Sequence, residues 1–193
     1  VSGSASITQS GNITQITQET DRAIINFSSF SVAENESVIF SQPSSSSITL
    51  NRVTGISPSS ILGQIQSDSQ VFIVNPNGVF FGPNSSVNVS ALVATTLDIS
   101  NDDFNGSNFS FAKNPEQAPD RQVINQGQIS TDGFVVLAGD FTENTGIIQS
   151  TVGNIALAAG ERISMNLFNN DLFNISVDAQ TISNLAGVSN SGT

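Results

Sequence analysis

Apolar and polar residues alternate along the second half of the chain, and the alternation returns at a fixed spacing. The segments Val135–Leu137, Ile155–Leu157 and Ile175–Val177 carry apolar residues at equivalent positions, about 20 residues apart. Alternation predicts strands, and a repeating unit of about 20 residues that holds two or three short strands predicts one coil of a parallel β-helix. The alternative architecture is a β-sandwich with frequent turns.

Asparagine and glycine stand between the predicted strands. Asn125, Asn144 and Asn154 are expected to stack in successive coils, with their side-chain amides hydrogen-bonded along a ladder. Glycine is expected at the corners because it adopts positive φ at little cost. The corner glycines are Gly127, Gly133, Gly139, Gly146, Gly153 and Gly160.

The first half is less regular but has the same strand character. Ile7–Thr17 alternates, and both Ala23–Phe30 and Ser37–Phe40 are rich in residues that favour strands. Ser57 is expected to cap one short helical turn that Gly63 ends. This half is therefore predicted to be strands and turns with a single helical turn.

The most apolar strand of the chain, Val71–Val74, is followed directly by Asn75, Pro76, Asn77 and Gly78. Pro76 fixes φ at the first central position of a turn, while an Asn and a Gly tolerate positive φ in the positions that follow. The Asn75 side chain is expected to bond the backbone two residues on. These four residues predict a tight turn between two apolar strands.

One stretch departs from the coil pattern. Residues 101–122 are polar and contain Pro115 and Pro119, and Asn105-Gly106 stands between phenylalanines. Asn-Gly between such residues predicts a hairpin. We expect an excursion off the body of the β-helix that packs its aromatic side chains back against it, namely Phe104, Phe109 and Phe111.

The chain is expected to be one domain, residues 1–193, of a longer exported protein, because it starts at Val1 without Met and has no closing element. Its predicted parts are an N-terminal cap with the first strands (1–40), coils with the Asn-Pro-Asn-Gly turn (41–100), the hairpin excursion (101–122) and regular coils (123–193).

The amino-acid composition excludes several kinds of catalytic and binding site. The chain has no His and no Cys, which removes imidazole bases, thiolate nucleophiles and the usual zinc ligands. Asp102 and Asp103 are adjacent, so on a strand they would point to opposite faces rather than form a catalytic pair. A net charge of −11 argues against nucleic acid as a partner. We therefore expect no enzyme activity, no catalytic residue, no metal and no cofactor.

With these residues in view, the sequence resembles the N-terminal secretion domains of two-partner-secretion exoproteins, typified by filamentous haemagglutinin. The resemblance covers nearly the whole chain and is strongest around the Asn-Pro-Asn-Gly turn. The segments that carry it are Arg22–Phe27, Phe30–Val32, Leu50–Gly55, Pro58–Ser59, Ile61–Gly63, Phe72–Gly82 and Ala94–Ile99.

The resemblance implies an all-β fold, a right-handed parallel β-helix with N-terminal capping strands. It also implies export by the general secretion machinery to the periplasm. There, the POTRA-type domains of a cognate Omp85-type outer-membrane β-barrel transporter would recognise the domain. The exoprotein would then fold outside, secreted or held at the cell surface.

Two interpretations of the signature residues stay open. The transporter either reads the Asn75–Gly78 turn or its flanks, including Asn51 and Arg52, or the turn is needed only to form the β-helix. Arg52 either contacts the partner or pairs with a nearby carboxylate. An alternative function is an adhesin module whose rows of Asn, Ser, Thr and Gln bind glycans or cell surfaces directly.

Overall fold

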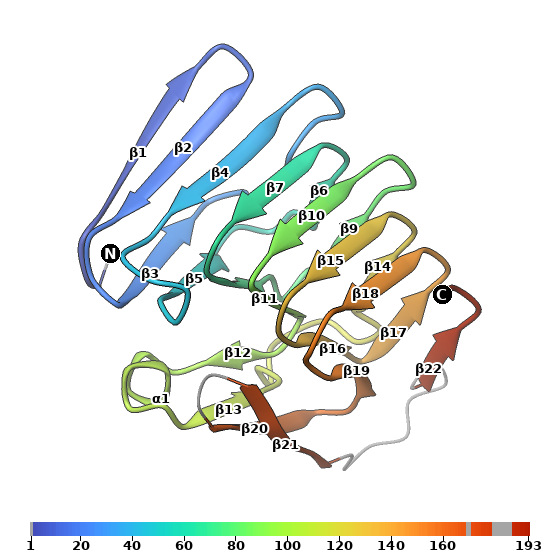
Figure 1. Cartoon of the computed structure of the whole chain (residues 1–193). Helices are drawn as coiled ribbons and strands as arrows, with labels where there is room; N and C mark the ends of the chain where they lie inside the picture. The colour runs from blue at the N-terminus through green and yellow to red at the C-terminus, as the bar shows by residue number, and fades with distance from the viewer. Residues whose placement is uncertain (1, 169–170, 179–186) are drawn as a thin grey trace.

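The computed structural model describes residues 2–168, 171–178 and 187–193, and it shows a parallel β-helix with a layer of antiparallel strands against one side (Figure 1). Each coil, meaning one turn of the β-helix, passes in order through three parallel sheets, which we call sheets 1, 2 and 3. The antiparallel layer is sheet 4. The expected all-β fold and parallel β-helix are confirmed.

The strands of the three parallel sheets follow one another in chain order along the helix axis. Sheet 1 consists of β1 (Ala5–Ser10), β2 (Ile13–Gln18), β4 (Ser37–Ser41), β7 (Gln64–Ser67), β10 (Ser86–Val89), β15 (Gln128–Thr131) and β18 (Ile147–Ser150). Sheet 2 consists of β3 (Arg22–Phe27), β5 (Ile48–Val53), β8 (Gln70–Val74), β11 (Ala91–Thr95), β16 (Val135–Gly139) and β19 (Ile155–Ala159). Sheet 3 consists of β6 (Ser59–Ile61), β9 (Val79–Phe81), β14 (Gln122–Asn125), β17 (Phe141–Asn144) and β22 (Gly187–Asn190).

Sheet 4 is built from two excursions that leave the β-helix at the same corner, after a strand of sheet 2 and before one of sheet 3. Within the described residues, its strands are β12 (Asp98–Ile99), β13 (Phe109–Ala112), β20 (Arg162–Phe168) and β21 (Asp171–Asp178), and the short helix α1 (Asn101–Asn105) connects β12 to β13. The two excursions pair with each other, because β13 lies antiparallel to β20.

The 20-residue period is confirmed for two of its three predicted copies. Val135 pairs with Ile155 in parallel strands of sheet 2. The third copy is wrong: Ile175 pairs antiparallel with Met165, and Val177 with Ile163, in sheet 4. Alternation marks a half-buried strand but does not say which strand it pairs with. The predicted regular coils are therefore interrupted at β20 and β21, and residues 169–170 and 179–186 lie outside the described residues.

The N-terminal end of the β-helix is covered by a strand of opposite direction. β1 runs antiparallel to β2, and β2 then pairs in parallel with β4. The two strands are joined at Gly11, whose φ of +58° suits glycine. β1 occupies the hydrogen-bonding edge that β2 would otherwise present to solvent. The predicted N-terminal capping strands are confirmed.

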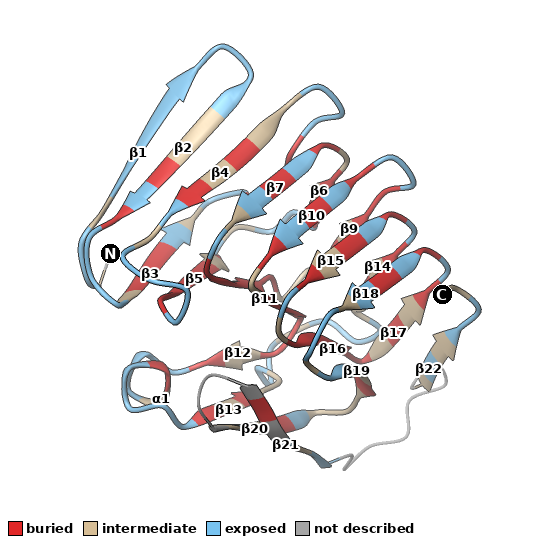
Figure 2. Cartoon of the chain, in the orientation of Figure 1, coloured by how far each residue is buried: buried red, intermediate tan, exposed pale blue. Residues whose placement is uncertain are grey.

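The middle strands of sheet 2 are buried on both faces, as the continuous red of β11 and β16 indicates (Figure 2). Val71 and Ile73 of β8 point into the β-helix interior, while Phe72 and Val74 pack against the cluster under sheet 4. A strand covered on both sides has no reason to alternate apolar with polar residues. This explains why Val71–Val74 is an unbroken apolar run.

The first excursion is an antiparallel pair, β12 with β13, as a hairpin predicts, but its connection contains α1 in place of the expected Asn-Gly turn. Ser100 caps α1 through its Oγ, which accepts a hydrogen bond from the Asp103 N–H at 3.0 Å, and Gly106 ends the helix with a negative φ of −80°. A Ser cap followed by two Asp residues in the first turn favours a helix start, and it outweighs the Asn-Gly turn signal. The predicted packing is confirmed, since Phe104, Phe109 and Phe111 are buried in the cluster between sheets 2 and 4.

Arg22 fastens this excursion to the first coil. Its guanidinium donates to the carbonyl oxygens of Phe104 and Asn105, the latter at 2.9 Å, and to Ser107 Oγ at 2.7 Å. Its Cζ lies 5.4 Å from the centroid of the Phe109 ring, within cation–π range. Burial lowers the pKa of Arg22 below its usual value, although nearby Asp21 opposes the shift. Arg22 thus bridges the cap end and α1.

Two smaller predictions are corrected. The helical turn expected after Ser57 is absent from the described chain there, because Ser59–Ile61 forms β6 and pairs in parallel with β9. Backbone hydrogen bonds to the neighbouring coil therefore outweigh the local preference of Ser57 for a helix N-cap.

The Asn ladder links Asn125 to Asn144 and Asn144 to Asn190, at 2.8 and 2.9 Å. The predicted third member, Asn154, donates instead to the Leu172 carbonyl oxygen.

The corner glycines are needed for close approach rather than for positive φ. Among the described glycines, positive φ is confined to Gly3, Gly11 and Gly78. A Cβ on Gly146 would lie 2.8 Å from the backbone nitrogen of Gly127 in the preceding coil, and closer still to its carbonyl oxygen. The prediction of positive φ at these corners is therefore wrong, and stacked backbones explain the glycines instead.

Candidate functional site

The Asn75–Gly78 turn is held from its first residue. Asn75 is fully buried, and its Nδ2 donates to the Ser57 carbonyl oxygen at 3.0 Å and to Ser59 Oγ at 2.9 Å. Its Oδ1 accepts from the Asn77 N–H at 2.9 Å, which confirms the predicted bond two residues on. Asn75 therefore joins the turn to the preceding coil and is not accessible on the surface.

The two middle residues of the turn are more exposed than its ends. Pro76 and Asn77 are half-buried, while Gly78 is buried and has a φ of +121°. Asn77 Nδ2 donates to the Gly55 carbonyl oxygen at 2.8 Å and to Asn75 Oδ1 at 3.2 Å. Positive φ at Gly78 makes a glycine necessary there. Pro76 and Asn77 are the members of the signature that a partner can touch on the folded domain.

Arg52 and Asn51 lie in β5 and face in opposite directions. Asn51 is fully buried among the inward side chains of the β-helix, where its Nδ2 donates to the Phe72 carbonyl oxygen at 3.1 Å. Arg52 forms an ion pair with Asp98 at 2.9 Å, which confirms the predicted carboxylate partner. It also donates to Asn101 Oδ1 at 2.7 Å and to the Ile99 carbonyl oxygen. Arg52 thereby ties the second coil to the first excursion.

A hollow of about 670 Å³ adjoins the exposed part of the turn. It lies between the turn after β5, the Asn-Pro-Asn-Gly turn and the loop that returns from β13. We call it the turn hollow. Its lining residues are Arg52, Val53, Thr54, Gly55, Ile56, Pro76, Asn77, Asp98, Asn114, Glu116, Gln117, Ala118 and Arg121.

Arg121 is a member of this site that the sequence analysis did not single out. Extending the pairing of Val123 with Val79 places Arg121 one coil beyond Asn77, and it lines both the turn hollow and a neighbouring hollow of about 250 Å³. The signal in the sequence is the alignment of Val123 with Val79 across the excursion. Without knowing where the excursion ends, that alignment cannot be made.

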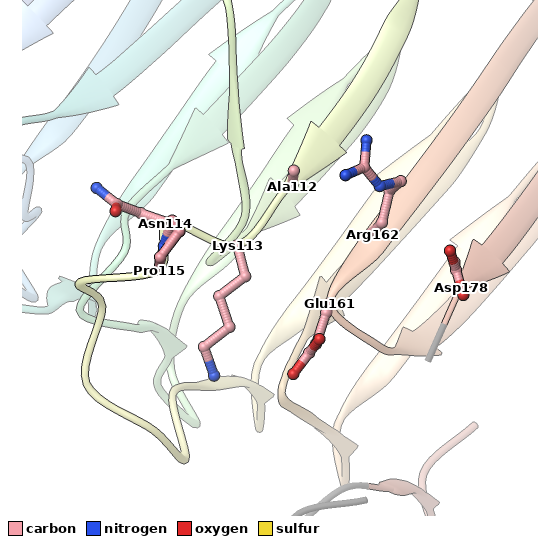
Figure 3. Close-up of a pocket in the computed structure, with 7 residues that line it drawn as sticks. All are labelled: Ala112, Lys113, Asn114, Pro115, Glu161, Arg162 and Asp178. Carbon is pink, nitrogen blue, oxygen red and sulfur yellow. The ribbon is translucent and has the colours of Figure 1, made fainter. Parts of the chain in front are cut away.

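A separate small hollow of about 290 Å³ lies between the loop after β13 and the start of β20 (Figure 3). Its rim carries Arg162, which is exposed, and Glu161 and Asp178. Lys113 contacts both carboxylate oxygens of Asp140, at 2.8 and 2.7 Å. The charges of Lys113 and Asp140 are therefore paired with each other.

Residues 2–168, 171–178 and 187–193 contain no group of three or more His, Cys, Asp or Glu side chains placed to hold a metal ion. None of the helices in these ranges is long and apolar enough to cross a bilayer. What the site presents is a shaped surface of mixed polar and apolar groups.

A capped parallel β-helix with a partly buried Asn-Pro-Asn-Gly turn and an antiparallel flanking sheet is the architecture of a β-helical secretion domain. The chain belongs to the TPS secretion domain family, which it matches over residues 1–193. TPS secretion domains are a non-enzymatic family, and they work with a cognate outer-membrane transporter partner. The exoproteins that carry them are secreted proteins that pass the periplasm of Gram-negative bacteria.

Individual relatives agree with this family. The chain is 36% identical over 173 residues to a heme/hemopexin-binding protein of Haemophilus influenzae strain Rd, covering 86% of the chain and 19% of that protein. A second heme/hemopexin-binding protein of Haemophilus influenzae is 32% identical over 143 residues, covering 65% of the chain and 15% of that protein. The chain thus spans less than a fifth of the length of these relatives.

The fold is also similar to a solved structure. The crystal structure of the HMW1 secretion domain from Haemophilus influenzae superposes with a TM-score of 0.88 and is 34% identical in sequence. The match covers 98% of this chain and 50% of that one. At this identity and coverage the likeness extends over nearly the whole chain.

Proposed function

We propose that the chain is the N-terminal secretion-signal domain of a large exoprotein. After export by the general secretion machinery, it is recognised in the periplasm by the POTRA-type domains of its cognate Omp85-type transporter. It then nucleates β-helix folding at the cell surface, so that the exoprotein is secreted or displayed there. It acts without catalysis. The observation that carries this proposal is the match to the TPS secretion domain family over residues 1–193.

The two ends of the β-helix support a role in nucleating folding. One end is covered by antiparallel β1, whereas β18, β19 and β22 are the last strands of their sheets within the described residues. At this second end two large apolar side chains are 47 and 48% exposed, those of Ile155 and Val188, whereas their register partners one coil earlier, Val135 and Thr142, are buried. A further coil stacked there would pair the strand edges and bury these side chains. Growth from the capped end toward the other end would then proceed coil by coil.

The strong negative charge of the domain suggests that electrostatic attraction speeds its association with the transporter. The salt dependence of the association rate therefore tests this proposal. A chain of net charge −11 is steered toward a basic face of the transporter's periplasmic domains. We expect its association rate with those purified domains to fall by about tenfold or more between about 0.01 M and 1 M salt, as the Debye length shrinks from about 30 Å to about 3 Å. Stopped-flow measurement tests this.

Two outcomes of the salt series would contradict the proposal, each in a different part. An association rate that does not change with salt would refute electrostatic steering while leaving recognition intact. If the wild-type domain shows no binding to the periplasmic domains at any salt concentration, recognition itself is refuted.

A second candidate function is direct adhesion, and the outer face of sheet 1 favours it. Gln66, Asn88, Ser130 and Gln149 occupy one register position in successive coils and form an outward row of amides and hydroxyls. Beside this row lies a polar hollow of about 430 Å³. Such a row can exchange hydrogen bonds with sugar hydroxyls. Binding of the purified domain to a glycan array, lost when Asn88 and Ser130 are replaced by Ala, would support adhesion.

The names of the two relatives report heme and hemopexin binding by those whole proteins. The matched segment is less than a fifth of each, and the present chain has no His, Cys or Tyr, the side chains that most often ligate haem iron. We therefore assign no haem site to this segment.

A further inference from the structure

The turn hollow contains buried polar atoms that lack partners. Both polar side-chain atoms of Gln117, Oε1 and Nε2, and the Nε of Arg121 are inaccessible to solvent and make no hydrogen bond within the described residues. Both residues line the hollow. Buried polar groups in folded proteins are nearly always satisfied. Three buried atoms without partners beside one hollow therefore indicate a place where the half-buried Gln117 and Arg121 side chains would gain hydrogen bonds by turning toward an external group.

Of the two arginines that line the turn hollow, one is neutralised by a carboxylate and the other is not. Arg52 also lines the hollow, but Asp98 neutralises it. The Arg121 side chain has neither an ion pair nor a hydrogen bond in the described part of the chain, and the carboxylate of Glu116, also on the lining, is exposed. The occupant that best complements Arg121 is a carboxylate, because a guanidinium binds a carboxylate through paired hydrogen bonds.

The backbone of Arg121 is held firmly, so its side chain is presented from a fixed base. The Arg121 N–H donates to Asp140 Oδ2 at 3.1 Å, and the Arg121 carbonyl oxygen accepts from the Asp140 N–H at 3.1 Å. Asp140 is itself buried and holds Lys113. A positioned donor loses less entropy on binding than a mobile surface side chain does.

The rim of the hollow adds an apolar contact. Ile56 is 92% exposed, and it lies on the turn between β5 and β6, near Pro76. An isoleucine this exposed gains from being covered by an apolar side chain of a partner. The hollow thus combines an unpaired cation, an unsatisfied amide and an exposed aliphatic side chain around the accessible half of the signature turn.

We infer that the turn hollow is the docking site for a segment of the transporter's periplasmic domains that carries an acidic side chain next to an apolar one. The acidic side chain pairs with Arg121, the backbone of the segment satisfies the Gln117 amide, and the apolar side chain covers Ile56. This inference rests on the proposed function and specifies its contact surface.

The test measures binding of the 193-residue chain to the purified periplasmic domains of the cognate transporter by biolayer interferometry. We expect Arg121→Gln to weaken affinity by about tenfold to a hundredfold, because a hydrogen bond to a charged group is lost, with the melting temperature unchanged. The matched control is Arg162→Gln, which removes the same charge from the exposed rim of the hollow in Figure 3. It should change affinity by less than about twofold.

Two further variants keep the result interpretable. Arg121→Lys should recover part of the lost affinity, and Ile56→Ser, at a side chain too exposed to matter for folding, should weaken binding by about fivefold. If wild type binds and Arg121→Gln and Arg162→Gln weaken it equally, or Ile56→Ser has no effect, the hollow is not the docking site and the proposed function stands. Absence of wild-type binding would overturn both. Arg121-dependent binding to a glycan array, with transporter binding intact in Arg121→Gln, would also overturn the inference.

Discussion

Replacing Phe72 with alanine is expected to lower the free energy of unfolding by about 3–5 kcal/mol, the range found for large-to-small changes in protein cores. The Phe72 ring is fully buried and lies 5.6, 6.2 and 6.4 Å, centroid to centroid, from the rings of Phe109, Phe104 and Phe111. These rings belong to the first excursion, so Phe72 holds the excursion against sheet 2. The loss should lower the melting temperature by about 6–20 °C for a chain of this size.

Phe80 provides the matched control for this substitution. It lies in β9, the next strand along the chain, and is half-buried on the outside of sheet 3. Phe80→Ala should cost about 1 kcal/mol or less, because less surface is buried there. Thermal unfolding followed by circular dichroism compares the two. Equal losses would contradict the view that sheet 4 is fixed through Phe72.

Replacing Asn75 with alanine is expected to lower the free energy of unfolding by about 2–4 kcal/mol, because buried groups lose their partners. Ser57, Ser59 and Asn77 all bond the Asn75 side chain. Since Asn75 is fully buried, the folded fraction of the variant should bind the transporter's periplasmic domains with wild-type affinity.

Replacing Asn77 with alanine removes the side-chain hydrogen bonds to Gly55 and Asn75. It should lower the free energy of unfolding by about 1–2 kcal/mol.

Melting temperature and affinity, measured on the same samples, separate the two interpretations of the signature. A lower melting temperature with unchanged affinity at low temperature would assign Asn75 to folding. Unchanged stability with lost binding in Asn75→Ala would mean that the transporter reads the turn through that residue, against its complete burial.

The parallel coils were predictable from the sequence because stacking repeats the same side-chain environment every coil. Val135 and Ile155 occupy the same register position in successive coils, and the 20-residue period reflects that pairing. The pairing of β21 with β20 was not predictable in this way. An antiparallel strand with one buried face shows the same alternation as a parallel one. The two excursions also meet only in space, since β13 and β20 are far apart in the chain.

In the candidate site, too, contacts between residues close in sequence were predictable, whereas contacts between residues far apart in the chain were not. The bond from the Asn77 N–H to Asn75 Oδ1 follows from local turn geometry, and it was predicted. The ion pair of Arg52 was predicted in kind, although its partner Asp98 could not be named. The turn hollow was not predicted, because it forms where residues 52–56, 76–77 and 114–121 meet. Only the register of the stacked coils brings Arg121 beside Asn77.

Export of the full-length exoprotein tests the secretion role most directly. Residues 1–193 are deleted while the inner-membrane export signal is kept, and an equally long deletion further along the protein serves as the control. The exoprotein is then quantified in the medium, at the cell surface and in the periplasm. We predict that the first deletion abolishes release and surface display, with the protein retained or degraded in the periplasm, while the control is exported. Export of the protein lacking residues 1–193 at the wild-type level would contradict a role as the secretion signal.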